Sequence, residues 1–160
     1  MGKFTTLMLF ALSLGGCATS TAPAPGEYGN FVAAADVAAD KAMANDVASK
    51  LVVLYPPART HFNLRQATPD AFGVWLVATL RSKGYAVAES RAMLPTAASP
   101  GVTTMAPEQS ADLALAYVVD QPLDSGIYRV TVLVNSQSLS RLYQAKEGGV
   151  AAAGYWIRKE

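Results

Sequence analysis

The chain is poor in the side chains that most often carry out chemistry. It contains one cysteine, Cys17, and one histidine, His61. An internal disulfide is therefore excluded, and a transition-metal site, which normally needs several histidine, cysteine or carboxylate ligands, has no cluster to use. A Ser-His-Asp triad would need His61, yet no G-x-S-x-G elbow is present to expose a serine. We interpret His61 as an ordinary hydrogen-bonded or exposed residue, and we expect no catalytic residue, no metal and no cofactor.

An excess of charge of either sign is also missing. The chain has 13 Lys plus Arg against 12 Asp plus Glu, with no run of basic residues. Binding to nucleic-acid phosphates requires a basic patch or stripe, so we expect no direct contact with nucleic acid. Gly148-Gly149 precedes a predicted strand rather than a helix, which indicates a hairpin turn and not a phosphate-binding loop.

No membrane-spanning helix is predicted near the N-terminus. The apolar run at residues 4–14 covers 11 residues. As a helix it would extend roughly 16 Å, about half of a hydrocarbon core. The run follows Lys3 and ends at Gly15-Gly16, an arrangement typical of a removable export signal.

Cys17 comes directly after this signal. Leu14-Gly15-Gly16-Cys17 resembles a lipobox, the signature of bacterial lipoproteins. The resemblance implies that residues 1–16 are a lipoprotein signal peptide and that Cys17 is diacylated as the first residue of the mature protein. An ordinary secretory signal with an incidental cysteine, or a small core cysteine, accounts less well for the position, the small neighbours and the apolar run together. Without a polybasic stretch, membrane attachment would depend on acyl chains on Cys17.

Residues 17–30 combine the lipidated cysteine with a predicted flexible tether. The segment is small and polar, is interrupted by prolines and glycines, and can bury too little apolar surface to offset the entropy of ordering. Ala18 stands where lipoproteins retained in the inner membrane typically carry aspartate. The resemblance therefore favours the outer membrane, facing the periplasm, over the inner membrane. Residues 31–160 are predicted to form a single periplasmic domain.

Two helices are predicted in this domain. Residues 31–54 carry an apolar stripe formed by Met43, Val47, Leu51 and Leu54, and Tyr55-Pro56-Pro57 ends the helix. Its first half is rich in alanine and could be frayed or semi-independent, and Asp40 is assigned to its polar surface.

The second predicted helix has clearer boundaries. Thr68 suits the N-cap, Pro69 the first helical position, Asp70 the positive end of the helix dipole, and Gly84 a left-handed stop. Its core face is predicted to consist of Phe72, Trp75, Leu76 and Leu80.

Several segments alternate with the period of a strand. They are residues 60–64, 85–89, 113–119, 128–134, 138–144 and 150–158. Residues 90–110, rich in Pro, Ser, Thr and Ala, are predicted to be a long mobile connection. The order of elements predicts an α+β fold with one mainly antiparallel sheet and the helices packed on one face.

Acidic and aromatic side chains give weak functional signals. A carboxylate pair could in principle hydrolyse glycosidic bonds, but the spacing singles out no pair, and we interpret the candidates as solvated turn residues. These candidates are Glu108, Asp112, Asp120 and Asp124. The aromatics Trp75, Tyr117, Tyr128 and Tyr143 are predicted to be mostly core. Tyr155 and Trp156 would point to opposite faces of a regular strand, so one of them is predicted to reach a surface suited to a partner.

Four stretches resemble the TrbH family of conjugal-transfer lipoproteins. They are GEYGNFV at 26–32, LVVLYPPARTHFNL at 51–64, DAFG at 70–73 and RSKGY at 81–85. The resemblance implies a component of the mating-pair-formation apparatus, a type IV secretion system that moves plasmid DNA. It carries over Cys17 as a functional residue and no catalytic residue, and it implies partners among the other proteins of that complex.

Three functions stay open at this point. The first is a structural lipoprotein of a conjugative secretion apparatus, acting by protein contacts. The second is a general outer-membrane lipoprotein that serves as adaptor or regulator of a periplasmic envelope protein. The third, a lipid-anchored enzyme acting on the cell wall, is disfavoured by the scarcity of histidine and cysteine.

Overall fold

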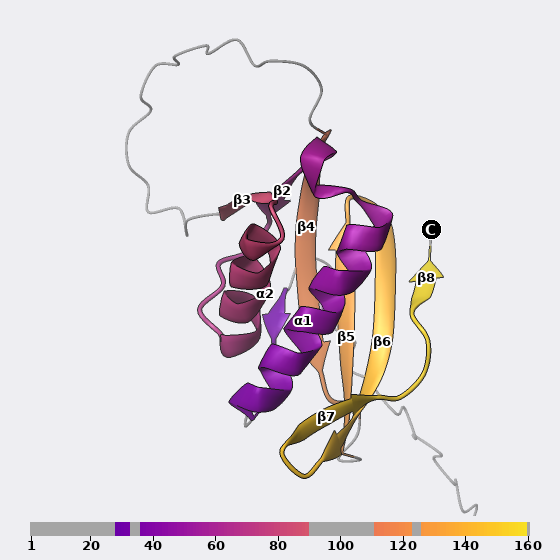
Figure 1. Ribbon diagram of the computed structural model, residues 1–160. Helices are drawn as coiled ribbons and strands as arrows, with labels where there is room; N and C mark the ends of the chain where they lie inside the picture. Colours follow the sequence, from indigo (N-terminus) through magenta and orange to yellow (C-terminus); the bar gives the residue numbers. More distant parts are fainter. Residues whose placement is uncertain (1–27, 33–35, 90–110, 123–125, 160) are drawn as a thin grey trace, which may run out of the picture.

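A computed structural model describes residues 28–32, 36–89, 111–122 and 126–159 (Figure 1). Cys17, the predicted signal peptide, residues 90–110 and the candidates Glu108 and Asp124 lie outside the described residues. The helices are α1 (Val37–Leu54) and α2 (Ala71–Ser82), with a short 3-10 turn, η1, at Pro57–Arg59. The strands are β1 (Gly29–Asn30), β2 (Thr60–Leu64), β3 (Ala86–Glu89), β4 (Ala111–Asp120), β5 (Ile127–Val134), β6 (Gln137–Lys146), β7 (Gly149–Ala152) and β8 (Ile157–Lys159).

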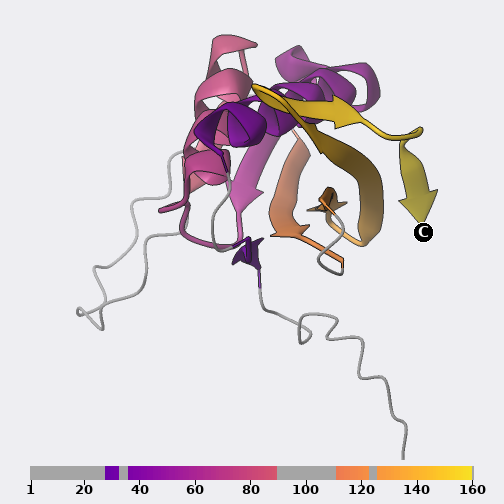
Figure 2. The same ribbon diagram turned by 90° about the horizontal axis from the view of Figure 1, so that it is seen from below.

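The strands form one mixed sheet in the order β3-β2-β4-β5-β6-β7, with β1 on β4 and β8 on β6. Strands β4 to β8 pair antiparallel, whereas β2 runs parallel to both β3 and β4. Both helices cover the same face of the sheet (Figures 1 and 2). The predicted α+β fold, with a mainly antiparallel sheet and helices on one face, is confirmed.

Helix α1 begins at Val37, and the predicted start at Phe31 is wrong. Asp36 is the N-cap, and its Oδ1 accepts a hydrogen bond from the Ala38 N–H at 3.0 Å. Upstream, Gly29 and Asn30 pair with β4, and the Phe31 N–H donates to the Val119 carbonyl at 2.8 Å. The predicted tether therefore ends before these residues, because the backbone of β1 finds hydrogen-bond partners on the edge of β4 beyond the end of β2.

The suggestion that residues 31–54 form a semi-independent helix is also wrong. The predicted stripe is confirmed, since Met43, Val47 and Leu51 are buried in one core cluster with α2 and the sheet, and Leu54 packs at its margin. Ala39, Ala44 and Ala48 are buried as well. Their small side chains let α1 approach its neighbours closely, so the alanine-rich composition reflects tight packing.

The core face of helix α2 is largely as predicted, but its N-cap is a different residue. Asp70 Oδ1, not Thr68, accepts from the Gly73 N–H at 2.9 Å, while the Thr68 hydroxyl donates to Glu89 at 2.7 Å. Phe72, Leu76 and Leu80 are fully buried. Trp75 is half-buried at the margin of the core, where the Lys41 ammonium lies 4.3 Å from its ring centre. The assignment of Trp75 to the core is therefore only partly right.

Candidate docking surface on the C-terminal strands

The last strand of the sheet is broken where the sequence predicts regular alternation through residues 150–158. Ala152 lies opposite Tyr143, and Ile157 lies opposite Ser140. Residues 153–156 therefore face only two residues of β6, and we call this segment the C-terminal bulge. Gly154 has a φ of +120°, which a residue with a side chain rarely adopts. Such bulges re-aim side chains at the edges of sheets.

Arg141 ties the C-terminal bulge to helix α1. Its Nε donates to the Gly154 carbonyl at 3.0 Å, and its Nη1 donates to Asp46 Oδ2 on α1 at 2.8 Å. The Tyr143 hydroxyl donates to the same carboxylate oxygen at 2.7 Å. Burial, followed by this bond to Asp46, raises the pKa of Tyr143, so the phenol stays a proton donor. Charge-assisted hydrogen bonds of this kind are stronger than neutral ones, so the bulge is held in one position.

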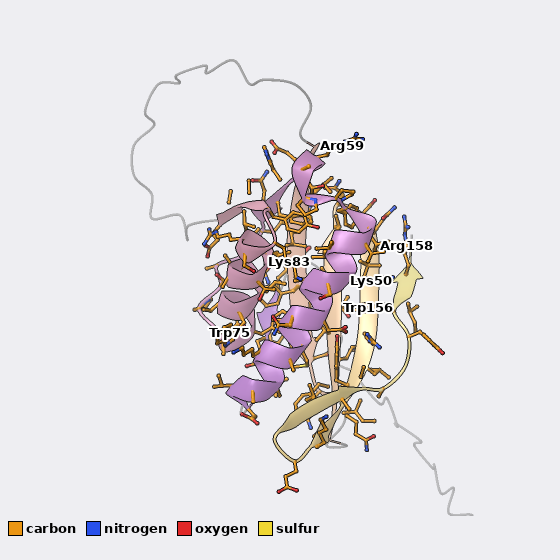
Figure 3. The ribbon with its side chains drawn as sticks, viewed as in Figure 1. Lys50, Arg59, Trp75, Lys83, Trp156 and Arg158 are labelled. Atoms are coloured by element: carbon orange, nitrogen blue, oxygen red, sulfur yellow. The ribbon has the colours of Figure 1, made fainter. Side chains whose placement is uncertain are left out.

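The two adjacent aromatics of the bulge have different environments. Tyr155 is 93% exposed, whereas Trp156 is half-buried against the core, with the Arg141 guanidinium 5.9 Å from its ring centre. Trp156 lies on the side of the sheet that carries α1 (Figure 3). The prediction that one of the pair reaches the surface is confirmed. The cause differs from the predicted one, because the bulge, and not regular strand alternation, separates them.

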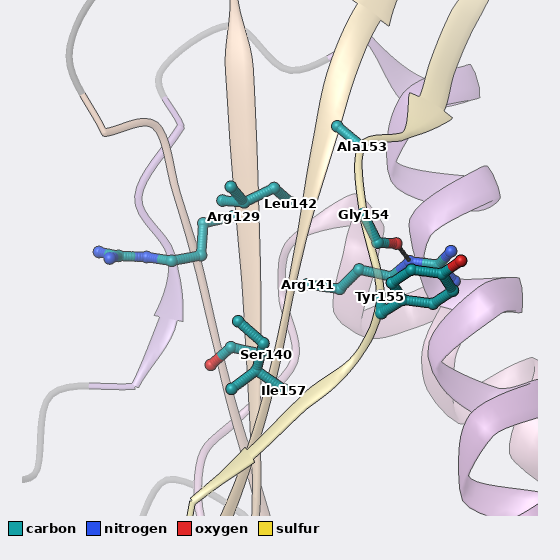
Figure 4. Close-up of a pocket in the computed structure, with 8 residues that line it drawn as sticks. All are labelled: Arg129, Ser140, Arg141, Leu142, Ala153, Gly154, Tyr155 and Ile157. Atoms are coloured by element: carbon teal, nitrogen blue, oxygen red, sulfur yellow. Dashed lines mark hydrogen bonds between the residues drawn. The ribbon is translucent and has the colours of Figure 1, made fainter.

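A hollow of about 490 Å³ opens beside the bulge. Arg129, Ser140, Leu142 and Ile157 line it together with residues of the bulge (Figure 4). Because Val130 and Val132 of β5 belong to the core under the helices, their neighbour Arg129 points to the opposite face of the sheet. Leu142 lies opposite Arg129 and Ile157 opposite Ser140, so the hollow lies on the face away from the helices.

The hollow is apolar, with satisfied polar groups around it. Leu142 is 40% and Ile157 is 69% exposed. Arg129 Nε donates to Asp120 Oδ1 at 2.9 Å, and the hydrogen bonds to Asp120 raise the pKa of Arg129. The hydroxyls of Thr131 and Ser140 share a hydrogen bond of 3.0 Å. This arrangement can bind an apolar group, and the residues that form it offer no activated nucleophile.

Among the described candidate side chains, only His61 and Asp112 are brought together. His61 Nδ1 lies 3.5 Å from Asp112 Oδ1, and both side chains are well exposed. Asp120 is engaged by Arg129 at the other end of β4. Within the described residues, no group of three or more His, Cys, Asp or Glu could hold a metal ion. The helices in the described part of the chain are too short or too polar to cross a membrane.

A second polar cluster lies where α1, α2, β1 and β4 meet. The sequence analysis did not predict it. Asp40 is buried instead of forming part of the polar surface, and it accepts from Asn30 Nδ2 at 3.3 Å. Desolvation, then repulsion from Asp70, raises the pKa of Asp40 to about 6. Nearby, the Tyr117 hydroxyl donates to Asp70 Oδ2 at 2.6 Å. One signal could have indicated this burial, because Asp40 lies three and seven residues before Met43 and Val47 of the stripe.

Comparison with known protein families identifies a match over most of the chain. A family model described as "Conjugal transfer protein TrbH" matches residues 25–160. The matched range includes every described residue, the C-terminal bulge among them, and begins after Cys17. No curated protein and no solved structure matched the chain.

Proposed function

Because the chain belongs to the TrbH family of conjugal transfer proteins, we propose that it is a lipid-anchored, non-enzymatic part of a conjugative type IV secretion apparatus. The family match over residues 25–160 is the observation that carries the proposal. In this role the protein acts through contacts with other proteins of the complex at the cell envelope.

The anchor is the sequence-based part of the proposal. Cys17 follows the apolar run and Gly15-Gly16, and Ala18 favours the outer membrane. Between Cys17 and Tyr28 lie the ten residues 18–27. A flexible segment of that length has a root-mean-square reach of roughly 17 Å, so the domain would work close to the membrane surface.

The docking surface supports action by protein contact. Exposed apolar side chains that cluster on one surface commonly mark a binding site. Leu142 and Ile157 line the hollow in this way, and exposed Tyr155 lies on the adjoining bulge, which Arg141 holds in place. A general envelope adaptor could use the same surface, and the family match is what favours conjugation over that alternative.

Plasmid transfer tests the proposal. Deleting the gene from its plasmid should reduce the transfer frequency from donor to recipient cells without changing plasmid copy number. A wild-type copy should restore transfer, and a Cys17→Ser copy should restore it poorly because the protein would lack its acyl anchor. Ser20→Ala, a small change in the same segment, is the matched control and should complement fully. Undiminished transfer from the deletion strain would contradict the proposal.

A further inference from the structure

The face of the sheet away from the helices carries exposed apolar side chains around the hollow. The solvated face of an antiparallel sheet normally carries polar side chains. By strand alternation, Ile127, Leu133, Leu142 and Ile157 all point to this face, and the two helices leave it open (Figure 2). Leu142 and Ile157 are the most exposed of the four. This surface therefore has the composition of a contact region.

The chain segment that leads from Cys17 into β1 cannot fill the hollow with a large side chain. Residues 18–27 read ATSTAPAPGE, so they contain no bulky apolar residue. Residues 90–110 do contain Met93, Leu94 and Met105, but the strands that they connect, β3 and β4, contribute no residue to the lining of the hollow.

A second copy of the chain is disfavoured by charge. Arg129 lies at the hollow with its side chain still 41% exposed in the ion pair with Asp120. Lys159 follows Ile157 by two residues on β8, so its side chain points to the same face of the sheet. A two-fold interface through this surface would place these cations near their own counterparts, and like charges at an interface oppose association.

The same charges favour an acidic partner. No carboxylate lines the hollow, and exposed Lys159 continues the strand that borders it, on the same face of the sheet as Ile157. One edge of β8 pairs with β6, and no described strand pairs with its other edge. An extended segment can add to such an edge by main-chain hydrogen bonds, while alternate side chains supply specificity.

From this arrangement we propose that the hollow receives a bulky apolar side chain from an extended, acidic segment of a partner protein. The segment lies along β8, with its apolar residue against Leu142 and Ile157 and a carboxylate two positions away against Lys159. The inference rests on the proposed function, because it names the chemistry of the partner through which the protein acts.

A short synthetic peptide tests this chemistry directly. The probe is acetyl-Asp-Thr-Phe-Thr-Asp-amide, which places a carboxylate two positions from the phenylalanine in either strand direction. Two matched peptides replace both aspartates by lysine or the phenylalanine by serine. Binding is measured on the full chain in mild detergent by the NMR shifts of the Leu142 and Ile157 methyl groups. The acidic phenylalanine peptide should shift these methyls, and both control peptides should bind at least tenfold more weakly.

Two variants sharpen the test. Ile157→Ala should weaken binding of the acidic peptide at least tenfold, and Lys159→Glu should reverse the preference in favour of the lysine peptide. Val53→Ala is the matched control, since Val53 is exposed on α1 over the opposite face. Equal binding of the acidic and lysine peptides, or no shift with any peptide, would overturn the proposal. So would methyl contacts from residues 90–110, or concentration-dependent dimerisation through the same methyls.

Plasmid transfer separates this inference from the proposed function. If both are right, Ile157→Ala and Lys159→Glu should lower transfer at least tenfold while their lipidation and amount stay at wild-type levels. If these variants transfer normally while the gene deletion and Cys17→Ser do not, the docking inference fails and the proposed function stands.

Discussion

Asp40 is a carboxylic acid at a position that is 2% exposed. Its one described hydrogen-bond donor is Asn30, and Asp70 and Asp36 add negative charge, so the pKa rises from 3.8 to about 6. Between these two values the native state binds more protons than the unfolded state does. The free energy of unfolding therefore falls as pH rises from about 4 to about 6. A shift of about two pKa units corresponds to roughly 3 kcal/mol.

Asp40→Asn should remove this loss. The amide has nearly the same shape and no charge, so the variant should become more stable than wild type above pH 6, by up to roughly 3 kcal/mol. Urea unfolding at several pH values between 4 and 8 measures the difference. Glu147→Gln is the control, because Glu147 is exposed in the turn after β6 and is not among the charges that raise the pKa of Asp40. Identical pH profiles for Asp40→Asn and wild type would show that Asp40 does not carry the effect.

Gly73 makes a close approach possible at the same cluster. A Cβ at this position would lie 2.1 Å from the Tyr117 hydroxyl oxygen and 2.8 Å from Thr68 Cβ. Gly73→Ala should therefore destabilise the domain by about 1–3 kcal/mol, although alanine favours helix by about 1 kcal/mol. Removing the hydroxyl with Tyr117→Phe should make the alanine change less costly in a double-mutant cycle. If the stability costs of Gly73→Ala and Tyr117→Phe simply add in the double variant, the clash is relieved in another way.

At the scale of elements, local signals predicted the helices better than the strand partners. Helix α2 is predicted by Asp70, an apolar stripe and Gly84, which all lie within a short stretch of sequence. The two residues of β1 carry no pattern, and their pairing depends on the edge of β4 about 90 residues later. Long-range pairing of this kind is set by the tertiary structure and cannot be read from a short window.

The candidate site was predictable to a similar extent. The adjacent pair Tyr155 and Trp156 indicated that one aromatic would be exposed, and Tyr155 is. The bulge itself needs Gly154 together with Arg141, whose partner Asp46 lies on α1. No local pattern connects these residues. The half-burial of Trp75 was missed for a related reason, because α2 presents one side of its stripe to solvent beside Lys41.

The cost of single substitutions on α2 should depend on how deeply each side chain is buried. Leu76→Ala removes a fully buried side chain and should cost about 2–5 kcal/mol in unfolding free energy. Trp75→Ala should cost less than the 3–5 kcal/mol typical of a buried aromatic, because part of the ring already contacts water. Chemical denaturation of the two variants side by side measures the order. A larger loss for Trp75→Ala would mean that the indole contributes more to the core than its exposure indicates.

Arg141 is the positioning residue of the C-terminal bulge. Arg141→Ala should free residues 153–156 while leaving the Tyr143 bond to Asp46 in place. Faster amide hydrogen exchange in the bulge, without faster exchange in β5, is the expected result. Lys146→Ala, at the far end of β6, serves as the control and should leave the bulge as it is. Unchanged exchange in Arg141→Ala would show that other contacts hold the bulge.

At the scale of the molecule, the predicted connection to the membrane and the proposed docking surface are separate parts. The chain enters the domain at β1, on the β4 edge, whereas the residues that line the hollow lie on β5, β6, β8 and the bulge. The predicted anchor can therefore be removed without touching the proposed docking surface. Under the proposed function, anchoring and docking are separate requirements for transfer, and each can be tested alone.

Fatty-acid labelling tests the anchor alone. Donor cells expressing the wild-type chain should incorporate labelled palmitate into the protein, and the protein should sediment with membranes. Cys17→Ser has no thiol to acylate, so it should incorporate no label and accumulate as a precursor of higher mass. Its domain should still bind the acidic phenylalanine peptide with wild-type affinity, because the hollow lies on β5, β6 and β8. Equal labelling of both proteins, or of neither, would show that Cys17 is not the lipid attachment point. Lost peptide binding in Cys17→Ser would show that anchor and docking surface depend on each other.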